Sequence, residues 1–171
     1  LLNNLQVTKN ILDIMIESKI DNIIFSSTAA VYKNKDKKID ENSELKPINK
    51  YGKSKLQAEN IIKEKKLNYI IFRFFNVYGP RLNTSGQYSA VFGNFLKQKK
   101  IKKPLTVVGN GKQTRDFIHV DDLTNAFLKI IKSKFANRIY NLGSGKEISI
   151  NKIAHLFGGK KIFIPKRPGE P

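Results

Sequence analysis

The sequence has no cysteine, only two histidines, and fewer than half as many acidic as basic side chains. The lack of cysteine excludes a disulfide framework, a thiolate nucleophile and a cysteine-rich zinc site. His119 and His155 are too few for a histidine-based metal centre. No apolar run approaches the roughly 18 residues that cross a bilayer, and the first residues have no signal-peptide pattern. We therefore expect a cytoplasmic protein without a metal site and without a membrane partner.

The excess of basic side chains has two interpretations. Lys and Arg number 32 against 14 Asp and Glu, which gives a formal net charge of +18. Such a charge can mark a surface that binds nucleic acid or a membrane. However, the lysines are scattered or lie in short runs such as 97–103, without the interleaved aromatic residues that stack on bases. We therefore expect a solvated lysine-rich surface rather than a nucleic-acid partner, although its field would still attract anionic ligands.

Helical and strand-like segments alternate along the 171 residues. Apolar residues at helical spacing predict helices over 5–16, 51–66, 91–100, 121–133 and 150–157. Short apolar runs predict strands over 22–26, 68–72, 105–108, 116–120, 138–142 and 161–164. Polar and turn-forming residues predict loops over 33–50 and 76–86. This alternation predicts an α/β fold with a mainly parallel sheet, and we expect both ends of the chain to be cut within a larger protein.

Tyr51 and Lys55 are four residues apart in the segment Tyr-Gly-Lys-Ser-Lys. On a helix this spacing places both side chains on one face, one turn apart. A phenol with a pKa of about 10 is a poor base at neutral pH, and a neighbouring ammonium brings that pKa toward the working range. The pair therefore predicts a proton-transfer site, although the same spacing also fits an exposed helical pair.

The strand predicted at 22–26 ends in small hydroxyl-bearing residues. Ser26, Ser27 and Thr28 follow its apolar part, and the next strand is followed by polar residues that include Asn76. In an open parallel sheet, ligands bind beyond the carboxyl ends of the strands. A hydroxyl there can donate to a sugar oxygen while the tyrosine exchanges its proton. This order of features favours a functional site over packing alone.

The segments that carry these features resemble, in order, the motifs of extended short-chain dehydrogenase/reductases that act on nucleotide-sugars: residues 26–32, 51–55, 73–81, 113–123, 140–145 and 167–170. The resemblance implies NAD as cofactor and a partial Rossmann-like parallel sheet, with part of a smaller α/β substrate-binding domain. Residues 1–80 would be the C-terminal half of the NAD-binding domain. Residues 81–171 would contribute the substrate-binding domain and the remaining Rossmann strands.

The same resemblance implies roles for individual residues. Tyr51 would be the catalytic base and acid at the sugar 4-hydroxyl, Lys55 would tune Tyr51 and hold the nicotinamide ribose, and Thr28 would be the catalytic hydroxyl. Asn4 and Phe75 would contact the cofactor together with these three. Substrate-binding residues would be Asn76, Arg115 and Arg167 for the diphosphate, with Tyr88 and Val108 beside the sugar. An arginine guanidinium suits phosphate binding because two of its N–H groups can donate to two phosphate oxygens at once.

Ala29 and Ala30 bear on the reaction. Related 4,6-dehydratases carry an Asp-Glu pair at these positions, and related decarboxylases keep the glutamate. Oxidation at C4, rotation of the keto-sugar and reduction from the other side need no such carboxylate. The resemblance therefore implies a UDP-glucose 4-epimerase-like isomerase of galactose metabolism or its N-acetylhexosamine counterpart. A nucleotide-sugar dehydratase or reductase, or a non-catalytic relative that binds RNA, is the alternative.

The remaining features have simpler interpretations. The glycine-containing segments 109–111 and 143–145 lack the full dinucleotide fingerprint and are expected to be turns. His119 is expected to be structural, and Asp121 and Asp122 to cap a helix. The family's glycine-rich phosphate loop does not occur in these residues, so we expect the chain alone to bind NAD weakly and to be inactive. The resemblance also implies a homodimer that pairs the helices at 5–16 and 51–66.

Overall fold

The computed structural model describes residues 2–33, 38–82, 84, 91–133 and 137–165. It divides into two compact units. The first unit comprises Leu1–Phe74 and Ala126–Leu142, and the second comprises Phe75–Asn125 and Gly143–Pro171. The chain thus leaves the first unit, returns to it for the second half of one helix and for one strand, and leaves it again.

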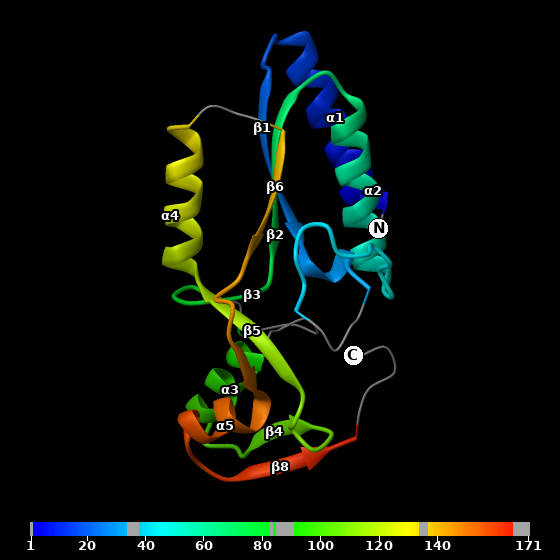
Figure 1. Cartoon of the computed structure of the whole chain (residues 1–171). Helices are drawn as coiled ribbons and strands as arrows, with labels where there is room; N and C mark the ends of the chain where they lie inside the picture. Colours follow the sequence, from blue (N-terminus) through cyan, green and yellow to red (C-terminus); the bar gives the residue numbers. More distant parts are fainter. Residues whose placement is uncertain (1, 34–37, 83, 85–90, 134–136, 166–171) are drawn as a thin grey trace. The chain divides into compact units, whose positions relative to one another are not determined.

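The first unit is built around a three-stranded parallel sheet in the order β1, β2, β6. These strands are β1 (Asn22–Thr28), β2 (Asn68–Phe74) and β6 (Arg138–Leu142). On one face lie two neighbouring helices, α1 (Leu2–Glu17) and α2 (Lys50–Glu64) (Figure 1). The opposite face is covered by α4 (Val120–Ile131), whose Phe127 ring lies 4.9 Å from that of Phe72.

The core of the first unit explains why these segments fold as they do. Leu12 and Met15 of α1 are one turn apart and buried, and they pack with Ile62 of α2 and with Leu67. The middle of β2 is buried from Ile70 to Arg73, as expected for a parallel strand covered on both faces. The apolar helix stripes and the central strand therefore fix how α2 lies across the sheet.

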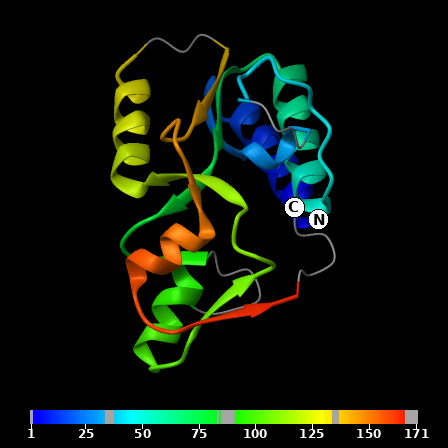
Figure 2. The ribbon, with the colours of Figure 1, turned by 60° about the horizontal axis from the view of Figure 1, so that its bottom comes forward.

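The second unit combines two small sheets and two helices. One sheet has the order β3, β5, β7, from β3 (Asn76–Tyr78), β5 (Thr114–His119) and β7 (Glu147–Ser149). The other is the parallel pair β4 (Leu105–Val108) and β8 (Lys161–Ile164). In both views α3 (Val91–Lys100) and α5 (Ile150–Phe157) lie side by side (Figure 1 and Figure 2).

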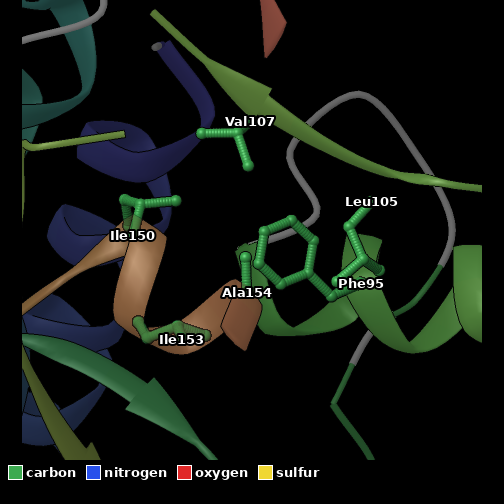
Figure 3. Packing of buried hydrophobic residues seen from close by; sticks show 6 residues of the cluster. All are labelled: Phe95, Leu105, Val107, Ile150, Ile153 and Ala154. Carbon is green, nitrogen blue, oxygen red and sulfur yellow. The ribbon is translucent and has the colours of Figure 1, made fainter. Parts of the chain in front are cut away.

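The core of the second unit lies between α3, α5 and β4. The Phe95 ring points toward Ala154, with Leu105 beside it (Figure 3). The six buried side chains of this core are Phe95, Leu105, Val107, Ile150, Ile153 and Ala154. Ser149 caps α5 by accepting a hydrogen bond from the Lys152 N–H, which fixes where this apolar helix begins.

The α/β fold with parallel strands agrees with the sequence prediction, but several local expectations were wrong. The loop predicted over 76–86 contains β3, which pairs with β5. The short strand β7 was not expected, and it runs antiparallel to β5.

The predicted cap of α4 also needs correction. Helix α4 begins at Val120, so Asp121 and Asp122 lie in its first turn instead of before it. Negative charge is still favourable there because it faces the positive end of the helix dipole. Within the described ranges, no helix is long and apolar enough to cross a membrane.

Candidate active site

Strand β1 delivers hydroxyl groups to its carboxyl end. Successive side chains of a strand point to opposite faces, so Ser27 points away from the face shared by Ser26 and Thr28. Ser27 is buried, and its hydroxyl donates to the Glu59 carboxylate over 2.5 Å. Thr28 caps the short 3₁₀ helix η1 (Ala29–Val31), since its Oγ1 accepts from the Ala30 N–H over 3.2 Å. The Thr28 hydroxyl hydrogen can then be donated elsewhere.

The first turn of α2 is packed directly against η1. Asn49 caps α2 and accepts from the Gly52 N–H over 2.7 Å. A Cβ atom at Gly52 would lie 2.2 Å from the Ala30 carbonyl oxygen and 2.9 Å from Pro47 Cβ. Only glycine therefore permits this close approach of α2 to η1. The Gly52 backbone, which follows Tyr51, thus packs against Ala30, which lies two residues after Thr28. Tyr51 itself is 50% exposed.

Lys55 ties the same helix to the end of β1. Its Nζ donates to the Ser26 carbonyl oxygen over 2.8 Å and lies 4.8 Å from the centre of the Phe25 ring. Burial lowers the pKa of the Lys55 ammonium, because a low-dielectric environment disfavours its charge. The structure thus places Thr28 and the Lys55 ammonium at one end of β1, beside the first turn of α2, which carries Tyr51.

A hollow of about 240 Å³ opens beside Lys55. Asn4 lies at its edge, and the Asn4 side-chain amide donates to Ser54 Oγ over 3.4 Å. Ser54 in turn donates to the Tyr51 carbonyl oxygen over 2.8 Å. The hollow is lined by Asn4, Val7, Thr8, Ile11, Phe25, Lys55 and Ala58. Its mixture of an amide, an ammonium and apolar side chains fits a ligand with hydroxyl groups and a flat ring, such as a nicotinamide riboside.

A buried ion pair beneath the site was missed by the sequence analysis. Glu59 and Arg73 are both fully or almost fully buried, with Arg73 Nη2 2.7 Å from Glu59 Oε2 and Nε 3.1 Å from Oε1. Burial disfavours the Arg73 charge, but hydrogen bonds to Glu59 and Tyr32 outweigh this and raise its pKa. A lone carboxylate on an apolar helix face, between Ala58 and Ile62, was the signal that Glu59 needs a buried partner.

Tyr32 extends this buried network. Its hydroxyl accepts from Arg73 Nη1 over 2.9 Å and donates to Asn141 Oδ1 over 2.7 Å. Burial raises the pKa of the Tyr32 phenol, although Arg73 opposes this. Arg73 lies near the end of β2, and its burial and its partners make it part of the framework that holds β1, α2 and β6 together.

The predicted substrate residues that the structure describes lie in the second unit. Asn76 begins β3, and its side-chain amide donates to the Asp116 carbonyl oxygen over 2.8 Å. Arg115 lies on β5 and donates from Nη1 to the Thr114 carbonyl oxygen over 2.7 Å. Val108 ends β4, and its carbonyl oxygen accepts from Gln113 Nε2 over 2.9 Å. Phe75 directly precedes β3, whereas Tyr88 and Arg167 lie outside the described residues.

The 143–145 segment is held as a turn by a carboxylate that the sequence analysis did not single out. Asp116 accepts from the N–H and the hydroxyl of Ser144 over 2.7 and 2.8 Å, and from the Gly145 N–H over 2.8 Å. These two N–H groups are therefore engaged within the protein instead of being directed at a phosphate, in agreement with the turn prediction.

His119 has contacts typical of a structural residue. Its ring lies edge-on to Tyr78, with the ring centres 5.1 Å apart, and its Nδ1 is 3.4 Å from Asp121 Oδ2. In the part of the chain that the structure describes, no three His, Cys, Asp or Glu residues gather in a way that could hold a metal ion.

The arrangement is that of a Rossmann-like enzyme, in which helices flank a parallel sheet and polar groups gather at the carboxyl ends of its strands. The sequence agrees with this class. Residues 1–143 match the NAD dependent epimerase/dehydratase family, and the chain belongs to that family. The NAD dependence of the family agrees with the cofactor that the sequence motifs predicted.

Individual relatives include both epimerases and dehydratases. The chain is 36% identical to a putative UDP-glucose 4-epimerase of Methanocaldococcus jannaschii, over 98% of this chain and 58% of that protein. It is 33% identical to human dTDP-D-glucose 4,6-dehydratase, over 81% of this chain and 40% of that protein. Among solved structures, a UDP-glucuronic acid 4-epimerase from Bacillus cereus, in complex with UDP-glucuronic acid and NAD, matches with a TM-score of 0.90 and 31% identity, over 99% of this chain and 57% of that one.

Proposed function

We propose that the full-length protein is an NAD-dependent epimerase that inverts C4 of a UDP-hexose through a transient 4-keto sugar. The observation that supports this proposal is that Thr28 and Lys55 lie at the end of β1, with the first turn of α2, which carries Tyr51, packed against η1. Lys55 is anchored to Ser26 there, and Gly52 lets α2 approach Ala30. The family relationship supports the reaction class, since UDP-sugar epimerases are among the relatives of this chain.

Each of the three residues has a task that its environment suits. The Tyr51 phenolate takes the proton of the sugar 4-hydroxyl and becomes a phenol, which later returns that proton. The Lys55 ammonium, one helical turn away, stabilises the phenolate before it takes the proton. The Thr28 hydroxyl donates a hydrogen bond to the same sugar oxygen. The chemistry supplied by bound NAD is reversible oxidation at C4.

Five residues are assigned to the cofactor by the resemblance of the sequence motifs to those of the family. In the first unit Asn4, Thr28, Tyr51 and Lys55 would hold the nicotinamide ribose, and the hollow beside Lys55 supports this assignment. The family resemblance alone assigns Phe75, which directly precedes β3, to the nicotinamide. A ribose presents hydroxyl groups, for which the half-buried Lys55 ammonium and the Asn4 amide are suitable hydrogen-bond donors.

The substrate side is assigned to residues with phosphate-binding chemistry. Asn76 and Arg115 would bind the diphosphate, together with Arg167, while Val108 and Tyr88 would line the sugar. The Asn76 amide has two hydrogens. One is donated to the Asp116 carbonyl oxygen, and the second can be donated to a phosphate oxygen.

Epimerisation is favoured over dehydration by the two alanines of η1. Elimination of water from the hexose needs an acid and a base near C5 and C6, and the strand end offers Ala29 and Ala30 where dehydratases carry carboxylates. The Ala30 carbonyl is already packed against Gly52. With no carboxylate at these positions, the site supports oxidation and reduction at C4 but not the elimination.

A homodimer is proposed from the exposed face of α1. Val7, Ile11 and Ile14 form one helical stripe and are 54%, 48% and 59% exposed. Because Val7 and Ile11 also line the hollow beside Lys55, Ile14 is the residue of this stripe assigned to the dimer contact alone. Contiguous apolar surface of this kind commonly marks a protein contact. Ile14 does not line the hollow beside Lys55, so Ile14→Asp should convert a dimer to a monomer in light-scattering measurements. A wild-type monomer would contradict this part of the proposal.

The test is product analysis with two substrates side by side. Purified full-length protein would be incubated with UDP-galactose and, separately, with UDP-N-acetylgalactosamine, and the sugars followed by NMR. We expect the C4 epimer of at least one substrate to accumulate to equilibrium without net release of NADH. A 4-keto-6-deoxy sugar would instead identify a dehydratase, and unchanged substrates would overturn the proposal.

The second candidate is a non-catalytic RNA-binding protein, favoured by one surface feature. A hollow of about 320 Å³ in the second unit is lined by Lys99, Lys102, Lys103 and Lys160. RNA affinity that falls steeply with salt concentration, in a protein without sugar turnover, would support this candidate. It has no use for Tyr51 and Lys55 at the end of β1, and we therefore rank it second.

A further inference from the structure

We infer that Asp116 is the positioning residue for the UDP-binding side chains, a role that rests on the proposed function because it acts through residues assigned to substrate and cofactor. Asp116 is half-buried on β5, between Arg115 and Phe117. All of its contacts described below lie within the second unit.

The Asp116 carboxylate organises the 143–145 turn. One oxygen accepts from the Ser144 N–H and hydroxyl, and the other accepts from the Gly145 N–H over 2.8 Å. A carboxylate that accepts three hydrogen bonds holds its partners more firmly than a neutral acceptor. The turn is thereby fixed against β5.

The same arrangement fixes Phe75. A Cβ atom at Gly143 would lie 2.7 Å from Asp116 Oδ2 and 3.2 Å from Phe75 Cδ2. The Gly143 backbone is therefore packed between the carboxylate and the aromatic ring. Because Asp116 fixes the turn, it also sets the wall against which Phe75 rests.

The backbone of Asp116 orients Asn76. The Asp116 carbonyl oxygen accepts one hydrogen of the Asn76 amide over 2.8 Å, which points the second hydrogen in a defined direction. Arg115 precedes Asp116 on the same strand, so its backbone is placed by the same contacts. Three residues proposed for ligand binding thus depend on Asp116, which itself needs no contact with the ligand: Phe75 through the turn that the carboxylate holds, Asn76 through the backbone carbonyl, and Arg115 as its neighbour on β5.

The test is the affinity of the full-length holoenzyme for UDP, measured by titration calorimetry. In Asp116→Asn, an amide NH₂ replaces one acceptor oxygen and faces an N–H or O–H donor of the turn. We expect UDP to bind about tenfold more weakly or worse. KM for the sugar should rise by a similar factor while kcat changes less, since Tyr51 and Lys55 are untouched. The matched control is Asp122→Asn, an exposed carboxylate on α4, which should bind UDP like the wild type.

A double-mutant cycle of Asp116 and Asn76 distinguishes a positioning role of Asp116 from a general loss of structure. If Asp116 acts through Asn76, then Asp116→Asn should weaken UDP binding less in an Asn76→Ala background than in the wild type. Purely additive effects, or an unchanged dissociation constant in Asp116→Asn, would overturn the inference. Should Asp116→Asn fail to fold, Ser144→Ala removes the hydroxyl that bonds to Asp116 and to the Lys146 backbone. It should still weaken UDP binding about threefold, and wild-type affinity in Ser144→Ala would overturn the inference.

The inference and the proposed function can fail separately. A wild-type protein that binds UDP but epimerises no sugar would sink the proposed reaction, while the UDP affinities of the variants would still decide the role of Asp116. If the wild type epimerises the sugar and Asp116→Asn binds UDP as tightly as the wild type does, the inference alone is overturned. A wild-type protein that does not bind UDP would overturn both.

Discussion

The ammonium of Lys55 donates a hydrogen bond to the carbonyl oxygen of Ser26 across 2.8 Å. This bond joins the helix that carries Tyr51 to the strand that carries Thr28. It places a half-buried cation at the carboxyl end of a parallel strand, where ligands bind in folds of this class. The predictions below follow from this relationship and from the packing that supports it.

Replacement of Lys55 by Met should lower the epimerisation rate and leave the free energy of unfolding nearly unchanged. The ammonium that would stabilise the Tyr51 phenolate is lost, so we expect epimerisation to fall by about 10²-fold or more. The methionine avoids burial of a charge, so the free energy of unfolding at neutral pH should hardly decrease. Activity assays and denaturant unfolding of the full-length protein check both parts, with the exposed Lys53→Met as control. A large loss of stability with retained activity would contradict the expected roles.

The pH dependence of stability should also report on Lys55. Burial lowers the pKa of its ammonium in the folded chain, so between the folded and the unfolded pKa the unfolded chain binds more protons. In that window the free energy of unfolding therefore rises with pH. The difference in unfolding free energy between wild type and Lys55→Met should change in favour of the wild type as the pH approaches the ordinary lysine pKa. If the difference in unfolding free energy between wild type and Lys55→Met did not change with pH, the lowered pKa of Lys55 would be contradicted.

Gly52→Ala should destabilise the protein although alanine favours helices. The helix preference is worth about 0.5–1 kcal/mol, but the new Cβ atom would meet the Ala30 carbonyl oxygen at 2.2 Å. Both contacting groups are near the backbone and cannot rotate away, so overpacking should cost about 1–3 kcal/mol net. Denaturant unfolding measures this, with the exposed Lys53→Ala on the same helix as control. Equal stability of Gly52→Ala and wild type would show that α2 is not packed on η1 as described.

The buried pair of Glu59 and Arg73 should be sensitive to the loss of one partner. Glu59→Gln leaves the Arg73 guanidinium buried without a counter-charge, which typically costs about 3–5 kcal/mol. The exposed Glu64→Gln on the same helix should change the free energy of unfolding by less than about 0.5 kcal/mol. The double change Glu59→Leu with Arg73→Met should recover part of the loss, because no unpaired charge remains. Similar stabilities of Glu59→Gln and Glu64→Gln would contradict the buried pair.

The sequence was most informative where turn residues delimit an apolar run. The bounds of α3, β4, β6, α5 and β8 were predicted as observed, because apolar runs and turn residues delimit them. The three-residue elements η1, β3 and β7 are too short to show a period, and they were missed. Their existence depends on partners elsewhere, such as Thr28 for η1.

The same reason explains which site residues were found. Tyr51 and Lys55 are close in sequence, so helical spacing alone was enough to place them on one face. Glu59 bonds to Arg73 across 14 residues and Asp116 bonds to Ser144 across 28 residues. Their importance follows only from the tertiary structure, which the local pattern does not contain.

The most direct test of the central claim is the rate of C4 epimerisation in Tyr51→Phe. The full-length variant would be compared with wild type and with Tyr140→Phe, which removes the same hydroxyl from a partly exposed tyrosine on β6. We expect Tyr51→Phe to lose about 10²–10⁴-fold of the rate, with the protein still folded and Tyr140→Phe near wild type. A Tyr51→Phe protein that epimerises the sugar at the wild-type rate would contradict the assignment of the site.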